Sequence, residues 1–165
     1  MLDRNFKPAT QIEARPNFSS LLDEAPTQVK WTPPIPQGSY VAVIQPGWAK
    51  TTSKKGDDVH EFNFKLVQPF EDVDEEELQS WINDNGPITE KIFKRQFYIT
   101  PNAIPYLDEF HQAAGIDLSK KVSRLLRNDE VGNSYIGVYL KHRPFSDGSG
   151  KVAVDIDRFF SVEGN

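Results

Sequence analysis

Cationic and aromatic residues stand close together in two segments of the sequence. The first segment, residues 46–58, contains Trp48, Lys50, Lys54 and Lys55, and the second, residues 141–150, contains Lys141, Arg143 and Phe145. Basic groups displace counterions from the phosphates of a nucleic acid, and aromatic faces stack on unpaired bases at ~1–3 kcal/mol per base. Both segments are therefore candidate contacts for a single strand.

Each of these segments has a second interpretation. Trp48 directly follows Pro46-Gly47, so it stands either on an exposed turn as a stacking platform or folded back as a plug over the core, because a bare indole in water is unfavourable. The segment around Phe145, rich in Ser and Gly, either closes over a bound strand or is an ordinary long hairpin loop.

Residue types that usually carry catalysis are scarce. Cysteine is absent, which excludes thiolate nucleophiles, disulfides and Cys-ligated metals. The three histidines, His60, His111 and His142, are scattered, and no HExxH, GxSxG or phosphate-cradling glycine loop is present. Asp155 and Asp157 on one strand could hold Mg²⁺ for a nuclease, which is the third-ranked alternative. The sequence does not predict an enzyme and indicates neither a cofactor nor a metal.

Charge is distributed unevenly along the chain. The formal net charge is −5, yet seven acids and no Lys or Arg lie between residues 71 and 84. Without these seven acids the net charge would be +2, so an otherwise mildly basic body carries one acidic insertion. The insertion is either simply solvated, or it competes with a nucleic acid for the basic surface or attracts a partner.

The proline pattern divides the chain. Six of the twelve prolines lie before residue 37, and proline interrupts regular structure. We therefore expect an extended, flexible arm over residues 1–36, followed by one domain over residues 37–165 with an insertion at 70–88. The arm either packs on its own domain or uses Phe18–Leu22 to bind a partner. The longest apolar run, residues 40–44, is far shorter than the ~20 residues of a membrane span, so we expect a soluble cytoplasmic protein.

Alternation of apolar and polar residues predicts five strands. The first covers residues 39–45; the second follows the loop 46–58 and ends at Pro69; the others lie at about 90–99, 135–141 and 152–157. Three helices are predicted. Asp74 caps a helix over 75–83; a second starts at an Asn102 cap, with Pro105 in its first turn, and ends at Gly115. A weaker helix covers 118–127, with Leu125 and Leu126 on its apolar side and Arg127 outside.

The second and third predicted strands have two distinct faces. Phe62, Phe64, Phe93 and Phe97 are assigned to the core. The opposite face carries Asn63, Lys65, Lys94, Gln96 and Tyr98, which mix donors with one aromatic ring. These five residues are candidate contacts for a nucleic acid; the alternative is a solvated face without a ligand.

The order of elements predicts a mainly β fold. Three strands, a helix and two strands match a five-stranded OB-fold Greek-key barrel, with the helix between strands 3 and 4 and an acidic helical insertion between strands 2 and 3. OB folds bind oligonucleotides on the face of strands 2 and 3 and through the loops joining strands 1–2 and 4–5. Strand order is not visible in a sequence, so other small α+β folds remain open.

Three runs of the sequence carry a resemblance to a known family. They are Ile35-Pro36-Gln37-Gly38-Ser39-Tyr40 and the strand after it, Lys50-Thr51-Thr52-Ser53-Lys54-Lys55-Gly56, and Glu61-Phe62-Asn63-Phe64-Lys65-Leu66-Val67. Together with the helix 104–115, they resemble a phage family of small OB-fold single-stranded DNA-binding proteins, long filed as a domain of unknown function. The resemblance covers roughly residues 35–160, and the acidic insertion is larger than the family pattern implies.

The resemblance implies a phage protein that binds single-stranded DNA without sequence preference during replication or recombination. Its expected partners are single-stranded DNA and phage or host replication proteins in the bacterial cytoplasm, and an oligomer is compatible with this role. The second hypothesis is a protein-interaction module of the same machinery that uses the barrel without a nucleic acid.

Overall fold

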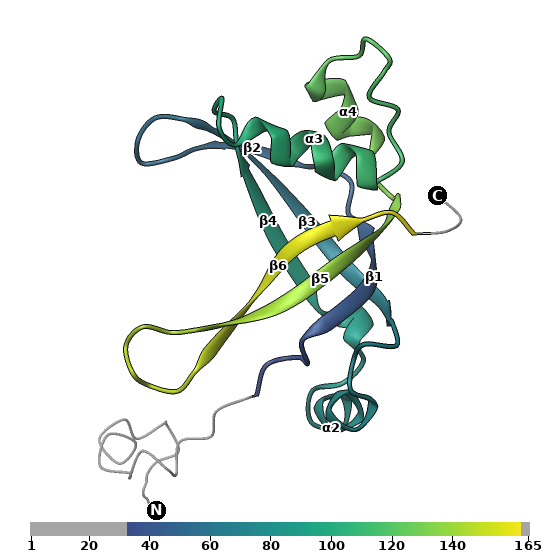
Figure 1. Ribbon diagram of the computed structural model, residues 1–165, viewed down its shortest axis with the longest axis vertical. Helices are drawn as coiled ribbons and strands as arrows, with labels where there is room; N and C mark the ends of the chain where they lie inside the picture. The colour runs from purple at the N-terminus through teal and green to yellow at the C-terminus, as the bar shows by residue number, and fades with distance from the viewer. Residues whose placement is uncertain (1–32, 163–165) are drawn as a thin grey trace, which may run out of the picture. The chain divides into compact units, whose positions relative to one another are not determined.

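The computed structural model describes residues 33–162, which form a mainly β structure with one six-stranded antiparallel sheet (Figure 1). The strands are β1 (Gly38–Ile44), β2 (Ala49–Thr52), β3 (Asp58–Pro69), β4 (Ile92–Tyr98), β5 (Tyr135–Pro144) and β6 (Val152–Phe160). The helices are α2 (Glu75–Asn85), α3 (Ile104–Ala113) and α4 (Arg124–Glu130), with a 3-10 turn, η2, at Ile88–Glu90. The predicted segment Phe18–Leu22 and most of the predicted arm lie outside the described residues.

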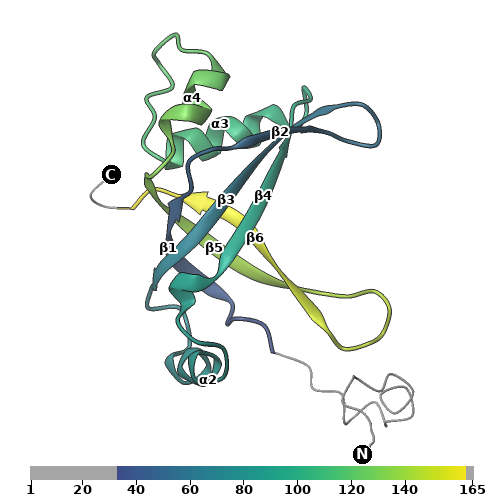
Figure 2. The same ribbon diagram turned by 180° about the vertical axis from the view of Figure 1, so that it is seen from behind.

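The long strand β3 organises the sheet. One edge of β3 pairs with β4 from Val59 to Lys65, and its other edge pairs first with β2 and then with β1. β1 pairs in turn with β5, and β5 with β6. The sheet bends so strongly that β3 and β4 cross β5 and β6, with α3 at one end and α2 at the other (Figures 1 and 2).

The sheet is open rather than closed. Within residues 33–162, no hydrogen-bonded ladder joins β4 to β6, the pairing that would close the sheet. The sheet also has six strands where the sequence predicted five, because the loop expected at 46–58 contains β2. Ala49 to Thr52 pair with Glu61 to Asp58 and make a short hairpin with the start of β3.

Alternating side chains of the strands build an aromatic core. Tyr40, Ala42 and Ile44 of β1 are fully buried, as period-two alternation predicts. The four phenylalanines assigned to the core, Phe62, Phe64, Phe93 and Phe97, are all at most 8% exposed. Phe110 of α3 lies at the centre of this core, with ring centroids 4.8 Å from Phe62 and 5.0 Å from Phe97.

A bulge changes the phase of β6. Leu140 pairs with Ile156 and Tyr139 with Arg158, so Asp157 is an extra residue with no partner position on β5. Such a bulge shifts the alternation of side chains by one residue. Consequently Ile156 is buried and Phe159 also packs against the core rings. Simple period-two alternation would place these two residues on opposite faces of β6.

Capping explains where α2 begins but not where α3 begins. The Asp74 side chain accepts a hydrogen bond from the Glu77 backbone N–H at 2.9 Å, which confirms the predicted cap. The predicted Asn102 cap of α3 is wrong, because the residue before the helix is Ala103 and its N–H bonds to the Thr100 hydroxyl at 3.2 Å. Pro105 does lie in the first turn, where its missing N–H costs no hydrogen bond.

Helix α4 presents the opposite face from the predicted one. It begins after a Ser123 cap rather than at residue 118, and Leu125 and Leu126 are more than half exposed. Arg127 is instead 9% exposed, and its guanidinium donates to the backbone carbonyls of Leu118 and Lys120. In the described part of the chain, no helix has the length and apolar character required to cross a bilayer.

Candidate nucleic-acid interface

One polar face runs along the outside of the β3–β4 pair. Asn63 pairs directly with Lys94, Lys65 with Ile92, and Glu61 with Gln96, whose side-chain amide donates to the Glu61 carboxylate at 3.1 Å. Tyr98 continues the row on β4 and is 45% exposed. The structure therefore brings together the five residues predicted for this face, which are Asn63, Lys65, Lys94, Gln96 and Tyr98, and adds one carboxylate, Glu61.

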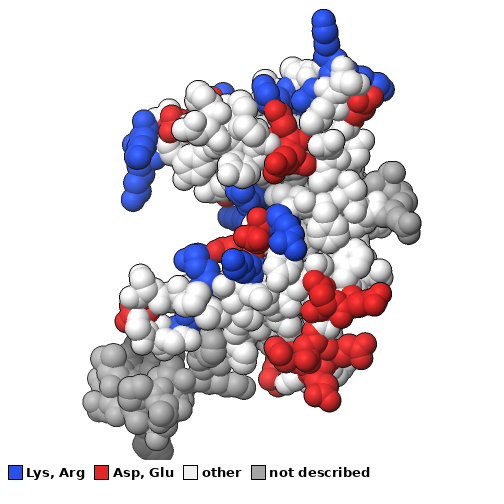
Figure 3. Space-filling view, viewed as in Figure 1, with Lys and Arg blue, Asp and Glu red and all other residues white. Residues whose placement is uncertain are grey.

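A cleft lies where the sheet is open, between β4 and β6. Its volume is about 460 Å³, and it is lined by Glu61, Lys94, Arg95, Gln96, Tyr98, Asp155 and Ile156. Figure 3 shows a notch in this face of the molecule, with basic and acidic side chains gathered around it. Because the cleft shares Lys94, Gln96 and Tyr98 with the outer face, the two form one continuous surface, which we call the β4 surface.

Arg95 is the cation of the cleft that sequence reasoning missed. It lies between Phe93 and Phe97, at a core-facing position of β4, and its guanidinium stands over the Phe97 ring at 4.6 Å from the centroid. Burial lowers the pKa of the Arg95 guanidinium, while the nearby Asp155 and Tyr106 act in the opposite direction; it stays charged because an arginine pKa starts far above neutral pH. The sequence does contain a signal that could have identified Arg95: a cation stands at a position of β4 where the alternation calls for an apolar residue.

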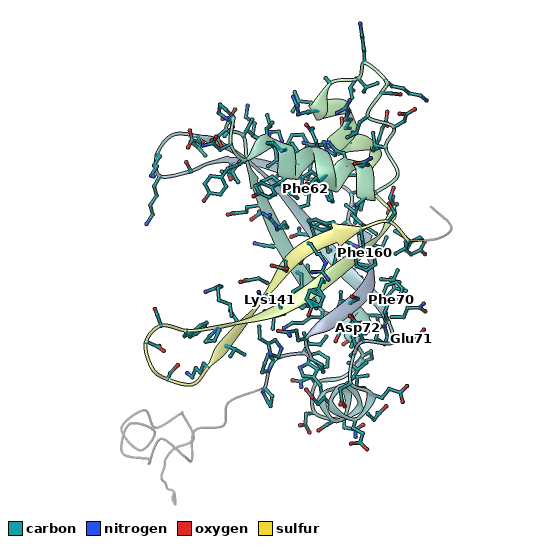
Figure 4. The ribbon with its side chains drawn as sticks, in the orientation of Figure 1. Phe62, Phe70, Glu71, Asp72, Lys141 and Phe160 are labelled. Atoms are coloured by element: carbon teal, nitrogen blue, oxygen red, sulfur yellow. The ribbon has the colours of Figure 1, made fainter. Side chains whose placement is uncertain are left out.

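The β5–β6 hairpin holds its predicted cations in different ways. Arg143 binds the Asp155 carboxylate, with its Nε 2.5 Å from Oδ2 and its Nη2 3.5 Å from Oδ1. Lys141 is exposed and pairs in register with Asp155 on the neighbouring strand (Figure 4). Phe145 stands in the connecting loop and is 41% exposed. The hairpin therefore places two further cations, Lys141 and Arg143, beside the cleft, and the Asp155 carboxylate neutralises part of their charge.

The loop between β1 and β3 divides into a packed part and an exposed part. The Trp48 indole packs on His60, with ring centroids 4.7 Å apart, and its N–H donates to the Asp129 carboxylate at 2.8 Å. Of the two interpretations of Trp48, the structure shows the folded-back one. Lys50 on β2 forms an exposed ion pair with Asp58 at 3.6 Å, whereas Lys54 and Lys55 stand exposed at the tip of the β2–β3 hairpin.

The acidic insertion is separate from the β4 surface. Its acids gather over α2, where Figure 3 shows a dense group of carboxylates apart from the notch. Asp72 fixes the insertion to the sheet, because its carboxylate accepts hydrogen bonds from the Ser39 backbone N–H at 3.0 Å and from the Ser39 hydroxyl at 2.8 Å. The dense group of acids on the insertion thus lies apart from the mixed charges of the β4 surface.

A second group of aromatic residues covers the outside of β5 and β6. The Phe160 ring stands over Gly137, where an added Cβ would approach it to 2.2 Å, and it also contacts Phe70 at 5.6 Å between centroids. Figure 4 shows Phe70 and Phe160 turned toward each other. The Arg158 guanidinium lies over the Tyr139 ring, 4.4 Å from the ring centroid. These rings are largely engaged with one another, unlike Tyr98.

Two of the three histidines are buried in one hydrogen-bonded chain. The Asn128 amide N–H donates to His60 Nδ1 at 2.9 Å, and the Asn128 carbonyl accepts from His111 Nε2 at 2.7 Å. This geometry joins β3, α3 and α4 and requires His60 to be neutral, because its Nδ1 accepts a hydrogen bond, whereas His111 donates through Nε2 in either protonation state. Burial lowers the pKa of His60 and of His111 below the ordinary value of 6.5. They are core histidines.

This histidine pair predicts that the protein loses stability on acidification. Each folded-state pKa lies below its unfolded value, so the stabilisation is complete above about pH 6.5 and is lost as the pH falls through the lowered pKa values. The free energy of unfolding should fall by at most about 1.4 kcal/mol per pH unit for each histidine. Urea unfolding at pH 7.5, 6.5 and 5.5 measures this. A His60→Gln variant should show a shallower pH dependence, and an unchanged one would contradict the assignment.

The nuclease alternative finds no support in the geometry. Asp155 is held by Arg143, and Asp157 stands 3.9 Å from Arg158. Over residues 33–162, no three His, Asp or Glu side chains are grouped as a metal site requires.

Comparison with known proteins adds no assignment: no protein-family model matches the chain, and no curated protein matches it significantly.

Proposed function

We propose that this chain binds single-stranded DNA along the β4 surface without reading its base sequence. The observation that carries the proposal is the row Lys94, Gln96 and Tyr98 on β4, which continues directly into a cleft containing Arg95. A strand laid along this row would find cations for its phosphates and an exposed ring for a base. Amide and carboxylate groups beside them supply hydrogen bonds that do not select one base.

The pairing of the strands supports an OB-type arrangement. β1 pairs with β3 and β5, β3 pairs with β4, and β5 pairs with β6. This is the strand order of a five-stranded Greek-key barrel that lacks its closing pair, with β2 as an addition. Helix α3 follows β4 and contacts both β4 and β6 at the open seam. In OB folds, the strands that correspond to β3 and β4 carry the face that binds oligonucleotides.

The two loops that OB folds use for binding carry cations that differ in how free they are to contact a phosphate. Lys54 and Lys55, at the hairpin tip, are exposed and extend the cationic path beyond Tyr98. Lys50 and Arg143 are each paired with a carboxylate, so they contribute less. Trp48 is omitted from the proposed contacts, because its ring packs on His60 and its N–H is bonded. A role in phage replication or recombination is supported by the sequence resemblance alone.

Salt titration tests the proposed function. We expect a fluorescein-labelled oligo-dT to bind at low salt, with log K falling linearly against log salt and a slope on the order of −2 to −3 for three to four phosphate contacts. Oligo-dT and mixed-sequence single strands should bind alike, because the contacts do not read bases. A duplex of the same length should bind more weakly, because its bases are not available to Tyr98. Equal binding of duplex and single strand, or no binding at low salt, would refute the proposal.

A protein-interaction module remains the second candidate, and one observation favours it. Leu125 and Leu126 are consecutive on α4, and both are more than half exposed. Exposed leucines of this kind are typical of contact surfaces. Retention of a replication protein by the wild type but not by a Leu125→Ser/Leu126→Ser variant, together with absent DNA binding, would favour this candidate over the first.

A further inference from the structure

Asp155 stands in an unusual position for a carboxylate in a proposed DNA-binding cleft. It lines the cleft from β6, opposite the β4 side that carries Lys94 and Arg95. Its two oxygens accept from the Nε and Nη2 of Arg143, at 2.5 and 3.5 Å. A two-point contact between a guanidinium and a carboxylate is also the geometry by which arginine binds a phosphate. The carboxylate therefore presents to Arg143 the same pair of oxygens that a strand would present.

Arg95 extends this arrangement across the cleft. Its guanidinium lies on the Phe97 ring and donates through Nη1 to the Gln96 carbonyl. In the described part of the chain, no carboxylate comes within ion-pair distance of Arg95, although Asp155 is near enough to raise its pKa. Arg95 is thus held in place by a ring and a carbonyl and keeps its full charge for an anion entering the cleft.

We propose that Asp155 occupies the position of a backbone phosphate in the free protein, and that a phosphodiester of the bound strand enters between Arg95 and Arg143 and displaces this carboxylate. The inference rests on the proposed function and adds a regulatory residue to the same site. In the free protein the carboxylate neutralises Arg143 and, among the residues that the structure describes, leaves Arg95 without an ion-pair partner. On binding, the strand replaces one anion by another, so part of the electrostatic gain is cancelled.

This exchange predicts that Asp155 weakens DNA binding. Replacing Asp155 with Asn keeps the side-chain shape and removes the negative charge, so Arg143 becomes available without first breaking an ion pair. We expect affinity for oligo-dT to rise about two- to five-fold at low salt, which is the range measured for exposed ion pairs. The slope of log K against log salt should steepen by up to about 0.7, since in the wild type the displaced carboxylate attracts cations again and offsets the counterions that one phosphate contact on a single strand releases.

Asp157→Asn is the matched control. Asp157 lies on the same strand, its side chain is exposed to a similar degree (43% against 47% for Asp155), and it also neighbours an arginine, Arg158 at 3.9 Å. It changes the net charge of the protein equally, but it stands outside the lining of the cleft. A third variant, Arg143→Gln, should weaken binding more strongly in the Asp155→Asn background than in the wild type.

The outcomes separate the two proposals. Tighter binding and a steeper salt slope for Asp155→Asn alone support the displacement. Equal effects of Asp155→Asn and Asp157→Asn, or no effect of either on a wild type that binds oligo-dT, overturn the displacement while the proposed function stands. If neither the wild type nor Asp155→Asn binds oligo-dT at low salt, both proposals fail.

Discussion

A Lys94→Glu/Arg95→Gln variant is expected to bind single-stranded DNA on the order of 100-fold more weakly than the wild type at low salt, since hydrogen bonds to charged groups are worth about 1.5–3 kcal/mol each. Lys94 stands on the exposed face of β4, and Arg95 lines the cleft beside it. The variant removes both cations and places one negative charge beside the strand. Fluorescence anisotropy of a labelled oligo-dT measures the change.

The control for this variant makes the same charge change elsewhere. Lys120 and Lys121 are consecutive and exposed, and they precede α4 at the end of the domain beyond α3 (Figure 1). A Lys120→Glu/Lys121→Gln variant, compared with the first variant at about 0.1 M salt, should bind within about two-fold of the wild type, because its charges lie before α4 and away from β4, where the salt screens their effect on a strand bound at β4. Equal losses in both variants would show that net charge, and not the β4 surface, determines binding.

Replacing Phe110 with Ala should cost about 3–5 kcal/mol of unfolding free energy, the range for a large aromatic residue in a core. The Phe110 ring is completely buried and contacts four other phenylalanine rings: those of Phe62, Phe64, Phe97 and Phe159. These rings come from β3, β4 and β6, so the cavity would lie where α3 covers the open seam. Chemical denaturation monitored by circular dichroism measures the loss.

Tyr106→Ala on the same helix is the control for the core prediction. Tyr106 is 58% exposed and lies one turn before Phe110, so both substitutions place alanine in the same helix. We expect a change of about 0.5 kcal/mol or less, as for surface positions away from special features. A loss below about 1 kcal/mol for Phe110→Ala would mean that α3 does not seal the core as described.

The strands and their faces could be predicted because the pattern that specifies them lies in neighbouring residues of the sequence. Period-two alternation in β3 separates the core-facing residues from the outer ones, and the structure confirms it at Phe62 and Phe64. The cap of α2 was predictable for the same reason, since Asp74 and Glu77 are three residues apart. The face shared by Asn63 and Lys94 followed from the same alternation applied to two neighbouring strands.

What the sequence did not predict depends on contacts between distant residues. The open seam results from the absence of pairing between β4 and β6, which are separated by more than 50 residues. Arg127 can be buried because the backbone carbonyls of Leu118 and Lys120, in the segment before α4, accept hydrogen bonds from its guanidinium. Trp48 folds back because Asp129, 81 residues away, accepts its N–H.

The cleft residues fall between these two cases. Lys94, Gln96 and Tyr98 were found by alternation, whereas Arg95 was missed because its position in the pattern is that of a core residue. A cation is stable there only because the seam is open and Phe97 offers its face. The same open seam thus both admits Arg95 and creates the cleft.

Chemical-shift mapping on ¹⁵N-labelled protein tests the central claim most directly. On titration with a short oligo-dT at low salt, we predict the largest amide shifts at residues 94–98 of β4 and at residues 155 and 156 of β6, which line the cleft. Amides of α2 should remain unchanged. Shifts confined to α2 or to the outer face of β5, with β4 unaffected, would contradict the account.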